Sequence, residues 1–327
     1  MMKTTFLSNS GFNYIPPERY ERGVNTLIRT EGIVYHMEVD ILHRGNLLLS
    51  DHHSLKTVNI ENKNVLSVVG VALEAGYAEG VGQNARFNII AGFIQLPPSE
   101  IIVLDTRNHC VRSVDRKTQA TNVIAGVCTS EGYAENNATL FRSPRSIILD
   151  VKNSRQLIVT DRGNRALRTI DVKTQLVKTI FKNNDTSTET YQGILQDPTT
   201  GDIYLTFRHG IARFDYNTHT ITHIAGSHTA GSILKDGRSS IQNILFYHPK
   251  ELVSLDSGSL LVADSYNHNL IVLNFTSGVG IPVCSGLRGH VDGDLWSCQL
   301  WYPQSLLLAN NTVYVGETGS IRAINSE

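Results

Sequence analysis

The sequence predicts an all-β protein built from six similar units, and three observations support this prediction. The tetrapeptide Gly-Tyr-Ala-Glu occurs twice, at residues 76–79 and 132–135. Short runs of β-branched residues between Gly, Asn, Asp and Pro are typical of strands. When the repeated segments are aligned, one position recurs at a period close to 54 residues, with one unit skipped. A fixed internal period of this kind indicates a repeat architecture. The residues at this position, here called the aligned column, are Ile90, Pro144, Pro249 and Pro303.

Each unit contains two apolar runs joined by a turn, and the first run ends in an acidic residue in most units. These pairs of runs lie at 47–60, 101–115, 157–171, 203–215, 260–274 and 313–325. A further strand-like run follows the pair at 65–70, 121–126, 177–181 and 221–226. A short apolar run, such as FIQL at 93–96, precedes each pair of runs. Each unit therefore has four predicted strands.

Four strands repeated six times predict a six-bladed β-propeller of four-stranded antiparallel blades. The sixth unit ends at Asn325 without its last strand, and the run VNTLI at 24–28 has the missing pattern. We therefore expect this N-terminal strand to complete the last blade and close the ring, which leaves no open sheet edge. The expected organisation is an N-terminal extension, residues 1–20, followed by one propeller domain, residues 21–327.

The composition indicates no global electrostatic partner. The chain has 29 basic and 30 acidic residues and a net charge of -1, which disfavours nucleic acid and anionic membranes as partners. No window approaches 18 consecutive apolar residues, and the first residues lack the apolar core of a signal peptide. A soluble protein without a membrane span is expected, and the sequence leaves its compartment open between cytoplasmic and extracellular.

Four cysteines occur, without a CxxC motif or zinc-finger spacing. Cys284 and Cys298 lie on either side of one short loop region, so a disulfide between them is geometrically reasonable. Buried free thiols are the favoured interpretation, because cysteine is often fully buried without any role.

Residues that recur at the turn in several units are expected to be structural. The acidic residue should accept backbone N–H groups, and it is present as Asp51, Asp105, Asp161 and Asp264, with Asn108, Asn164 and Asn267 following in three units. His109 and His268 occupy equivalent turn positions in opposite units, which disfavours a shared metal ion. His219 and His223 are about 13 Å apart along a strand at ~3.3 Å per residue, too far for one ion.

Three segments resemble the NHL-repeat six-bladed propellers: the GYAEG and ARF elements within 69–87, LDTRNHCVRSVD at 104–115 and VADSYNHNLIVLN at 262–274. The resemblance spans residues 24–325 and is weaker in the first, fourth and sixth units. It implies a propeller fold and makes protein interaction the commonest expectation, although some members of the family bind single-stranded RNA. Amidating lyases that resemble this family carry central histidines on a metal.

The residues that differ between units give the candidate site. The turns between the second and third strands lie on the same face of the predicted ring as the links between units. This face is here called the signature face. We predict that it binds a partner through Arg107, Arg162, Arg165, Arg208, His209 and Tyr266 from the turns, and Tyr77 and Tyr133 from the links. Solvated arginines paired with acids of the links are the alternative, and those acids are Glu79, Glu135, Asp236 and Asp292.

Two classes of function follow from these predictions. The favoured one is a non-enzymatic recognition or scaffold module that binds a protein, or another polyanionic partner, on the signature face. The alternative is a lyase or hydrolase at the mouth of the central channel, with His36 and Glu38 as inward polar residues and a Ca²⁺ or Zn²⁺ ion. No nucleophile elbow, zincin or phosphate-loop motif supports an enzyme, so no catalytic residue and no cofactor is predicted. Single-stranded RNA is the least favoured ligand, because the sequence pI is close to 6.9.

Overall fold

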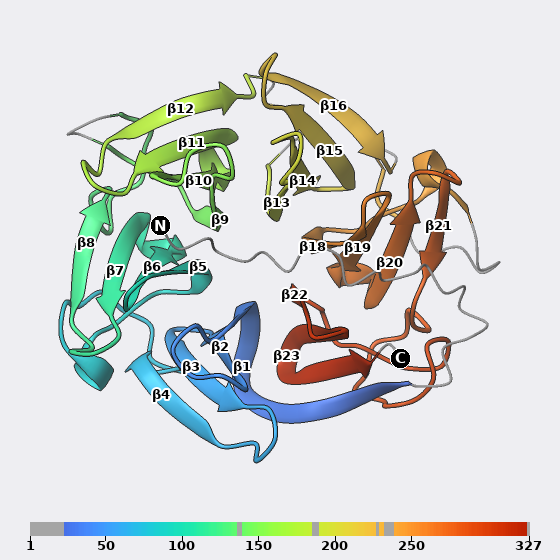
Figure 1. Cartoon of the computed structure of the whole chain (residues 1–327), viewed down its shortest axis with the longest axis horizontal. Helices are drawn as coiled ribbons and strands as arrows, with labels where there is room; N and C mark the ends of the chain where they lie inside the picture. Colours follow the sequence, from blue (N-terminus) through green and yellow to red (C-terminus); the bar gives the residue numbers. More distant parts are fainter. Residues whose placement is uncertain (1–22, 136–138, 185–189, 227–228, 232–238, 326–327) are drawn as a thin grey trace.

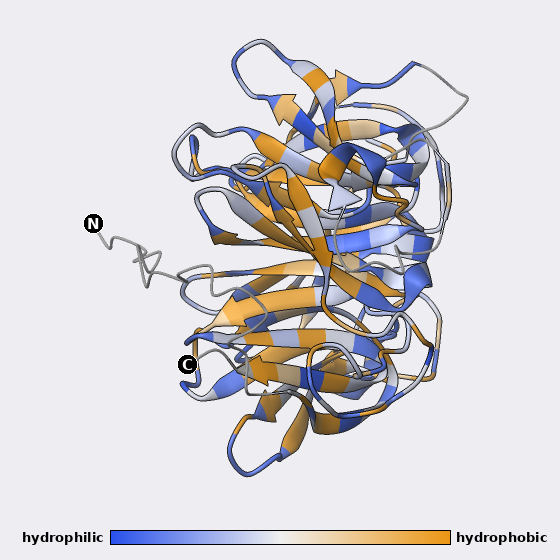
Figure 2. Cartoon of the chain, turned by 90° about the vertical axis from the view of Figure 1, so that its right-hand side faces the viewer, coloured by the Kyte–Doolittle hydropathy of each residue, from blue (hydrophilic) through white to orange (hydrophobic). Residues whose placement is uncertain are grey.

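The computed structural model describes residues 23–135, 139–184, 190–226, 229–231 and 239–325. Their strands form a ring of sheets around a central axis (Figure 1). In side view the hydrophobic segments lie within the strands and the connections are largely hydrophilic (Figure 2). Within these ranges no helix is long and apolar enough to cross a membrane. The expected extension, residues 1–20, lies outside the described residues.

Three sheets have four strands that follow one another in sequence and pair antiparallel. The first comprises β5 (Ile90–Leu96), β6 (Glu100–Asp105), β7 (Cys110–Asp115) and β8 (Thr121–Ala125). The second comprises β9 (Pro144–Leu149), β10 (Gln156–Asp161), β11 (Ala166–Asp171) and β12 (Val177–Lys182). The third comprises β13 (Ile194–Gln196), β14 (Ile203–Phe207), β15 (Gly210–Asp215) and β16 (Thr220–Ala225).

The other two sheets are larger. A five-stranded sheet comprises β17 (Ser239–Ser240), β18 (Pro249–Asp256), β19 (Ser259–Asp264), β20 (Asn269–Asn274) and β21 (Val279–Pro282). A six-stranded sheet comprises β1 (Val24–Val39), β2 (Asn46–Asp51), β3 (Ser54–Asn59), β4 (Val65–Gly70), β22 (Ser305–Ala309) and β23 (Thr312–Asn325).

The prediction of six separate four-stranded blades was wrong, because the described strands form five sheets. The expected first and last units share one sheet, since β1 continues without a break from one to the other. Its residues 24–33 pair with β23 and residues 34–39 pair with β2. The pairing expected for VNTLI with the last unit is therefore present, but it joins two units instead of completing one.

Gly32 lets β1 pass from one partner to the other. A Cβ atom at this position would lie 2.7 Å from His52 Nδ1 and 2.8 Å from Asp51 Oδ1, so a larger residue would collide with the turn after β2. No proline interrupts residues 24–39. The connection between the units therefore stays extended and remains part of one strand.

The acidic residues at the turns are structural, as predicted, but in the turn itself they bind an asparagine side chain and not the turn backbone. Short 3₁₀ turns follow β6, β10 and β19, at Thr106–Asn108, Arg162–Asn164 and Ser265–Asn267. In each turn the aspartate before it accepts a hydrogen bond from the asparagine side chain, at 2.9, 2.8 and 2.7 Å. The residue after each turn is left-handed, with φ of 60°, 54° and 54° at His109, Arg165 and His268.

The repeated Gly-Tyr-Ala-Glu stretch packs on a buried arginine. Arg112 is fully buried, lies 3.0 Å from Asp105 and has its Cζ 5.4 Å from the ring centroid of Tyr77. Its Nη2 donates to the carbonyl oxygen of Ala78 at 2.8 Å. In the second copy Arg168 contacts residues 133 and 134 and Asp161 in the same way. The sequence therefore repeats because each copy covers one buried charge.

The core lies between neighbouring sheets. For example, Phe87 and Phe93 pack with apolar residues of both the six-stranded sheet and the β5–β8 sheet. One disulfide ties Cys110, at the start of β7, to Cys128 in the connection after β8. The other joins Cys284 and Cys298, both in the connection between β21 and β22, so the interpretation as free thiols was wrong.

Candidate functional site

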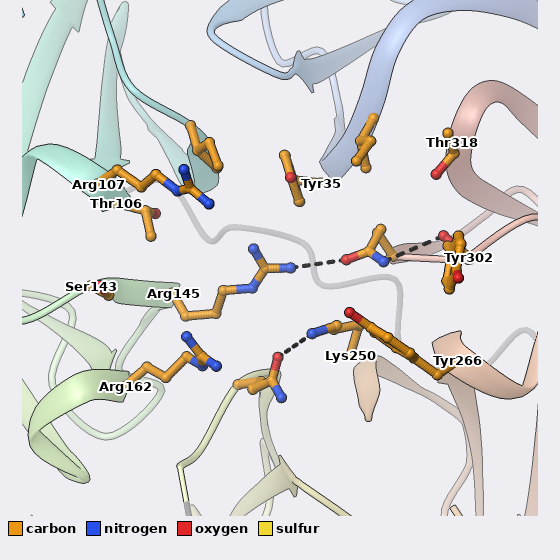
Figure 3. Close-up of a pocket in the computed structure, with 14 residues that line it drawn as sticks. Tyr35, Thr106, Arg107, Ser143, Arg145, Arg162, Lys250, Tyr266, Tyr302 and Thr318 are labelled. Atoms are coloured by element: carbon orange, nitrogen blue, oxygen red, sulfur yellow. Dashed lines mark hydrogen bonds between the residues drawn. The ribbon is translucent and has the colours of Figure 1, made fainter. Parts of the chain in front are cut away.

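A cavity of about 380 Å³ opens among the inner strand ends and the turns of the signature face (Figure 3). The turns contribute Thr106, Arg107, Arg162 and Tyr266. The starts of the inner strands and the residues just before them contribute Ile33, Tyr35, Ile89, Ser143, Arg145, Gln192, Lys250, Tyr302 and Gln304, and β23 contributes Thr318.

The repeat itself supplies most of this lining. Arg145, Lys250 and Gln304 each follow the proline of the aligned column, and Tyr35 and Gln192 occupy the matching place on their inner strands. The inner strands of a ring converge on its axis. Equivalent positions of different units, such as the one after the proline, can therefore face the same central space. This position was not recognised in the sequence, although the proline column marks it.

The residue before the column has an unusual backbone conformation. Its φ is 65° at Ile89, 52° at Ser143, 51° at His248 and 48° at Tyr302. A positive φ at a β-branched residue such as Ile89 is a genuine outlier. Such conformations persist only where surrounding contacts hold them, and they concentrate at functional sites.

Those contacts come from two units at once. His53, His109 and His268 accept hydrogen bonds at Nδ1 from the backbone N–H groups of residues 89, 143 and 302 in the next unit. The acidic residues Asp105 and Asp161 accept the N–H group one position earlier, at 2.8 Å. The cavity backbone is therefore fixed by turn residues whose side chains do not line it.

Four basic residues line the cavity, and none of its lining residues is acidic. They are Arg107, Arg145, Arg162 and Lys250. Two of them are held by neutral amides, since Arg145 donates to Gln304 Oε1 at 3.1 Å and Lys250 donates to Gln192 Oε1 at 2.5 Å. A recessed group of basic side chains without an acidic lining residue attracts anions.

The electrostatics of the cavity also favour an anionic ligand. Burial, together with the charges of Arg145 and Arg162, holds the pKa of Lys250 well below its ordinary value. Two buried donors of the lining, Arg162 Nε and Gln192 Nε2, have no hydrogen-bond partner among the described residues. Buried donors without partners cost free energy unless a ligand or water satisfies them.

Aromatic rings form the opposite wall. Figure 3 shows Tyr266 and Tyr302 across the cavity from Arg107 and Arg162, and their ring centroids are 5.1 Å apart. Tyr266 is 43% exposed. Outside the cavity these rings continue into a cluster, here called the aromatic cluster, which consists of His209, Tyr247, His248, Tyr266, His268 and Tyr302.

The structure brings together only some of the residues predicted for the partner site. Arg107, Arg162 and Tyr266 line the cavity, and His209 is buried in the aromatic cluster. Four others lie away from the cavity: Arg165 and Arg208 on the turns, and Tyr77 and Tyr133 over Arg112 and Arg168. Arg145, Lys250 and Tyr302 were missed.

The acids expected near these arginines make other contacts. Glu79 and Asp292 pair with the buried Arg112 and Arg322, at 3.4 and 2.6 Å. Glu135 accepts a hydrogen bond from the backbone of Thr179, and Asp236 lies outside the described residues. The described acids among them therefore contact residues outside the cavity lining.

His36 and Glu38, the inward polar residues of the enzyme hypothesis, make polar contacts between inner strands. His36 Nδ1 lies 2.9 Å from Glu251 Oε1, and Glu38 accepts two hydrogen bonds from Gln95. Although burial lowers the pKa of His36, the carboxylates of Glu251 and Glu38 outweigh it and raise that pKa to about 10. Among the described residues, no group of three or more His, Cys, Asp or Glu is arranged to hold a metal ion.

Comparison with known proteins gives distant sequence relatives. No family model matches the chain. It is 22% identical over 331 residues to the Arabidopsis thaliana protein SUPPRESSOR OF QUENCHING 1, chloroplastic, over 93% of this chain and 31% of that protein. It is 25% identical over 143 residues to the Homo sapiens NHL repeat-containing protein 2, over 40% of this chain and 19% of that protein. The chain thus spans less than a third of the length of either relative.

Solved structures show the same fold in proteins of different function. An auxiliary nutrient binding protein from Bacteroides ovatus has a TM-score of 0.70 at 15% identity, covering 94% of this chain and 78% of that chain. A virginiamycin B lyase from Staphylococcus aureus has a TM-score of 0.55 at 10% identity, covering 93% and 98%. A chain of a nidogen/laminin complex has a TM-score of 0.54 at 14% identity, covering 83% and 85%. These similarities establish a propeller fold with distant NHL-repeat relatives.

Proposed function

We propose that this protein is a non-enzymatic recognition module that binds an anionic group of a partner, in the first place a protein, at the cavity of the signature face. One observation carries the proposal: Arg107, Arg145, Arg162 and Lys250 line a single cavity that has no acidic lining residue. A rigid ring of sheets that presents such a cavity is suited to binding.

The surrounding chemistry supports binding over catalysis. His36 is paired with Glu251 and has a pKa raised to about 10, so it is a poor general base near neutral pH. The cavity lining itself contains no histidine, cysteine or carboxylate. The nutrient binding protein and the nidogen/laminin complex show that this fold occurs in binding proteins.

The test compares two double charge reversals on the same face. The variant Arg107→Glu/Arg162→Glu changes two cavity residues, and the control Arg165→Glu/Arg208→Glu changes two predicted residues outside the cavity by the same total charge. Affinity capture from an extract of the source organism is then compared for the wild type and both variants, after thermal melts show that all three fold.

A protein retained by the wild type and the control but lost by the cavity variant supports the proposal. We expect the loss to exceed about 30-fold, because leaving one partner of a buried charge pair without its counter-ion costs roughly 2–5 kcal/mol. Equal capture by the cavity variant and the wild type would contradict it. If the captured material is RNA and not protein, the partner is a nucleic acid and the proposed protein partner is wrong.

A further inference from the structure

We infer that the anionic group bound in this cavity is a phosphate monoester attached to a ring. This inference rests on the proposed function and specifies its ligand. The observation that carries it is the juxtaposition, in one cavity, of a cationic wall with an aromatic wall (Figure 3).

The cationic wall fits phosphate better than carboxylate. A phosphate monoester carries about -1.5 to -2 charges near pH 7 and three strong acceptor oxygens, whereas a carboxylate has one charge and two oxygens. Three arginines and Lys250 line the cavity, and the guanidinium groups of Arg107, Arg145 and Arg162 can each donate two parallel hydrogen bonds. The unpartnered Gln192 Nε2 adds a neutral donor from a residue that is 1% exposed.

The aromatic wall accounts for the rest of the ligand. Tyr266 and Tyr302 line the cavity opposite the arginines, and Tyr266 is held by ring contacts to Tyr247, His248 and Tyr302 at 4.9–5.2 Å. Rings held in this way offer a preformed face for a second ring at little cost in conformational entropy.

The size of the cavity limits the ligand to one ring and its phosphate. Its volume of about 380 Å³ lies near the lower end of the range for small-molecule sites, roughly 300–1,000 Å³. Inorganic phosphate alone would leave the tyrosine wall without contacts. Two sources share the required chemistry, namely an aryl phosphate, such as a phosphorylated tyrosine side chain of a partner, and a sugar phosphate.

Isothermal titration calorimetry of the full chain tests this inference with four probes: phenyl phosphate, glucose 6-phosphate, inorganic phosphate and benzoate. We expect at least one ring phosphate to bind ten-fold or more tightly than inorganic phosphate and than benzoate. Tighter binding of phenyl phosphate indicates an aryl phosphate ligand, and tighter binding of glucose 6-phosphate indicates a sugar phosphate.

Three variants separate the two walls. Tyr266→Ser should remove the advantage of the ring phosphate over inorganic phosphate and leave inorganic phosphate unchanged, whereas Arg162→Gln should weaken all phosphate probes. The control Arg208→Gln, which alters an exposed cation outside the cavity, should match the wild type.

The inference is overturned if no ring phosphate binds more tightly than inorganic phosphate, or if benzoate binds as tightly as phenyl phosphate. If no probe binds but partner capture still depends on Arg107 and Arg162, the ligand class is wrong and the recognition function stands. If capture is also independent of these arginines, both proposals fail.

Discussion

Replacing Asp264 by asparagine should make the stability of this protein less dependent on pH. In two other turns a buried arginine follows the aspartate seven residues later, as Arg112 follows Asp105 and Arg168 follows Asp161. Ile271 occupies that place after Asp264 and is itself buried. Within the described part of the chain, Asp264 therefore accepts its hydrogen bonds from neutral donors, the Asn267 side chain and the backbone N–H group of Tyr247.

The size of the effect follows from the pKa of this carboxyl group. Burial raises the pKa of Asp264 from 3.8 to about 7, against the opposing effect of its two hydrogen bonds. The folded state then binds a proton more tightly than the unfolded state, so the contribution to stability is complete below about pH 4 and is lost as pH rises to about 7. At 1.36 kcal/mol for each pKa unit, the loss between pH 5 and pH 8 is roughly 3 kcal/mol.

Urea unfolding of the wild type and Asp264→Asn at pH 5 and pH 8 measures this loss. The variant forfeits one hydrogen bond, worth about 1 kcal/mol, at both pH values, but its free energy of unfolding relative to the wild type should rise by roughly 3 kcal/mol between them. Asp161→Asn is the comparison: burial also raises the pKa of Asp161, but Arg168 opposes this rise. That variant should be destabilised at both pH values because Arg168 loses its counter-ion. Parallel pH profiles of Asp264→Asn and the wild type would refute the reasoning.

Four further outcomes are expected. Arg168→Met should lower the free energy of unfolding in urea by roughly 3–5 kcal/mol, because Asp161 stays buried without its cation; a loss below about 1 kcal/mol would show that the pair is dispensable. Cys284→Ser/Cys298→Ser, which opens a bridge across 14 residues, should cost roughly 3 kcal/mol in the same assay, and an unchanged midpoint would exclude the bridge as a source of stability. Deleting residues 21–30 should unfold or aggregate the protein, since it removes most of the pairing between β1 and β23, whereas equal melting temperatures in circular dichroism would contradict this. Because burial and neighbouring arginines hold the pKa of Lys250 well below its ordinary value, anion binding should take up protons and weaken as pH rises; calorimetric enthalpies that do not change with the ionisation enthalpy of the buffer would argue against it.

The strand pairs and the turn chemistry were predictable because they repeat. Each pair depends on local composition and on an acid with its asparagine at fixed spacing, and such signals recur in the sequence. The division into sheets was not predictable in the same way. It depends on whether residues 29–33 bend or stay extended, and that follows from the close approach of Gly32 to the turn at Asp51 and His52, a contact between segments 20 residues apart.

The cavity was only partly predictable for a related reason. Arg107, Arg162 and Tyr266 were recognised because they stand in turns that vary between units. Arg145 and Lys250 stand at the start of inner strands, and their place in one cavity follows only once these strands are known to converge. The buried Arg112 and Arg168 were hidden for the opposite reason, because a polar residue within a strand is usually assigned to the solvent face.

The repeated contacts explain how one fold can carry different sites. In three units the cavity backbone is held by an acid of the same unit and by a histidine of the preceding unit, as residues 142 and 143 are by Asp161 and His109. Neither contact involves the side chains of Ser143 or Arg145, which line the cavity. Substitution at the lining can therefore change what is bound while these backbone hydrogen bonds stay in place. The same logic predicts the asymmetry seen here, in which two adjacent units contribute Arg107, Arg145 and Arg162 to one wall and later units contribute Tyr266 and Tyr302 to the other. A ring of similar units thus becomes a site with two chemically different walls, without any change in the bonds that hold it together.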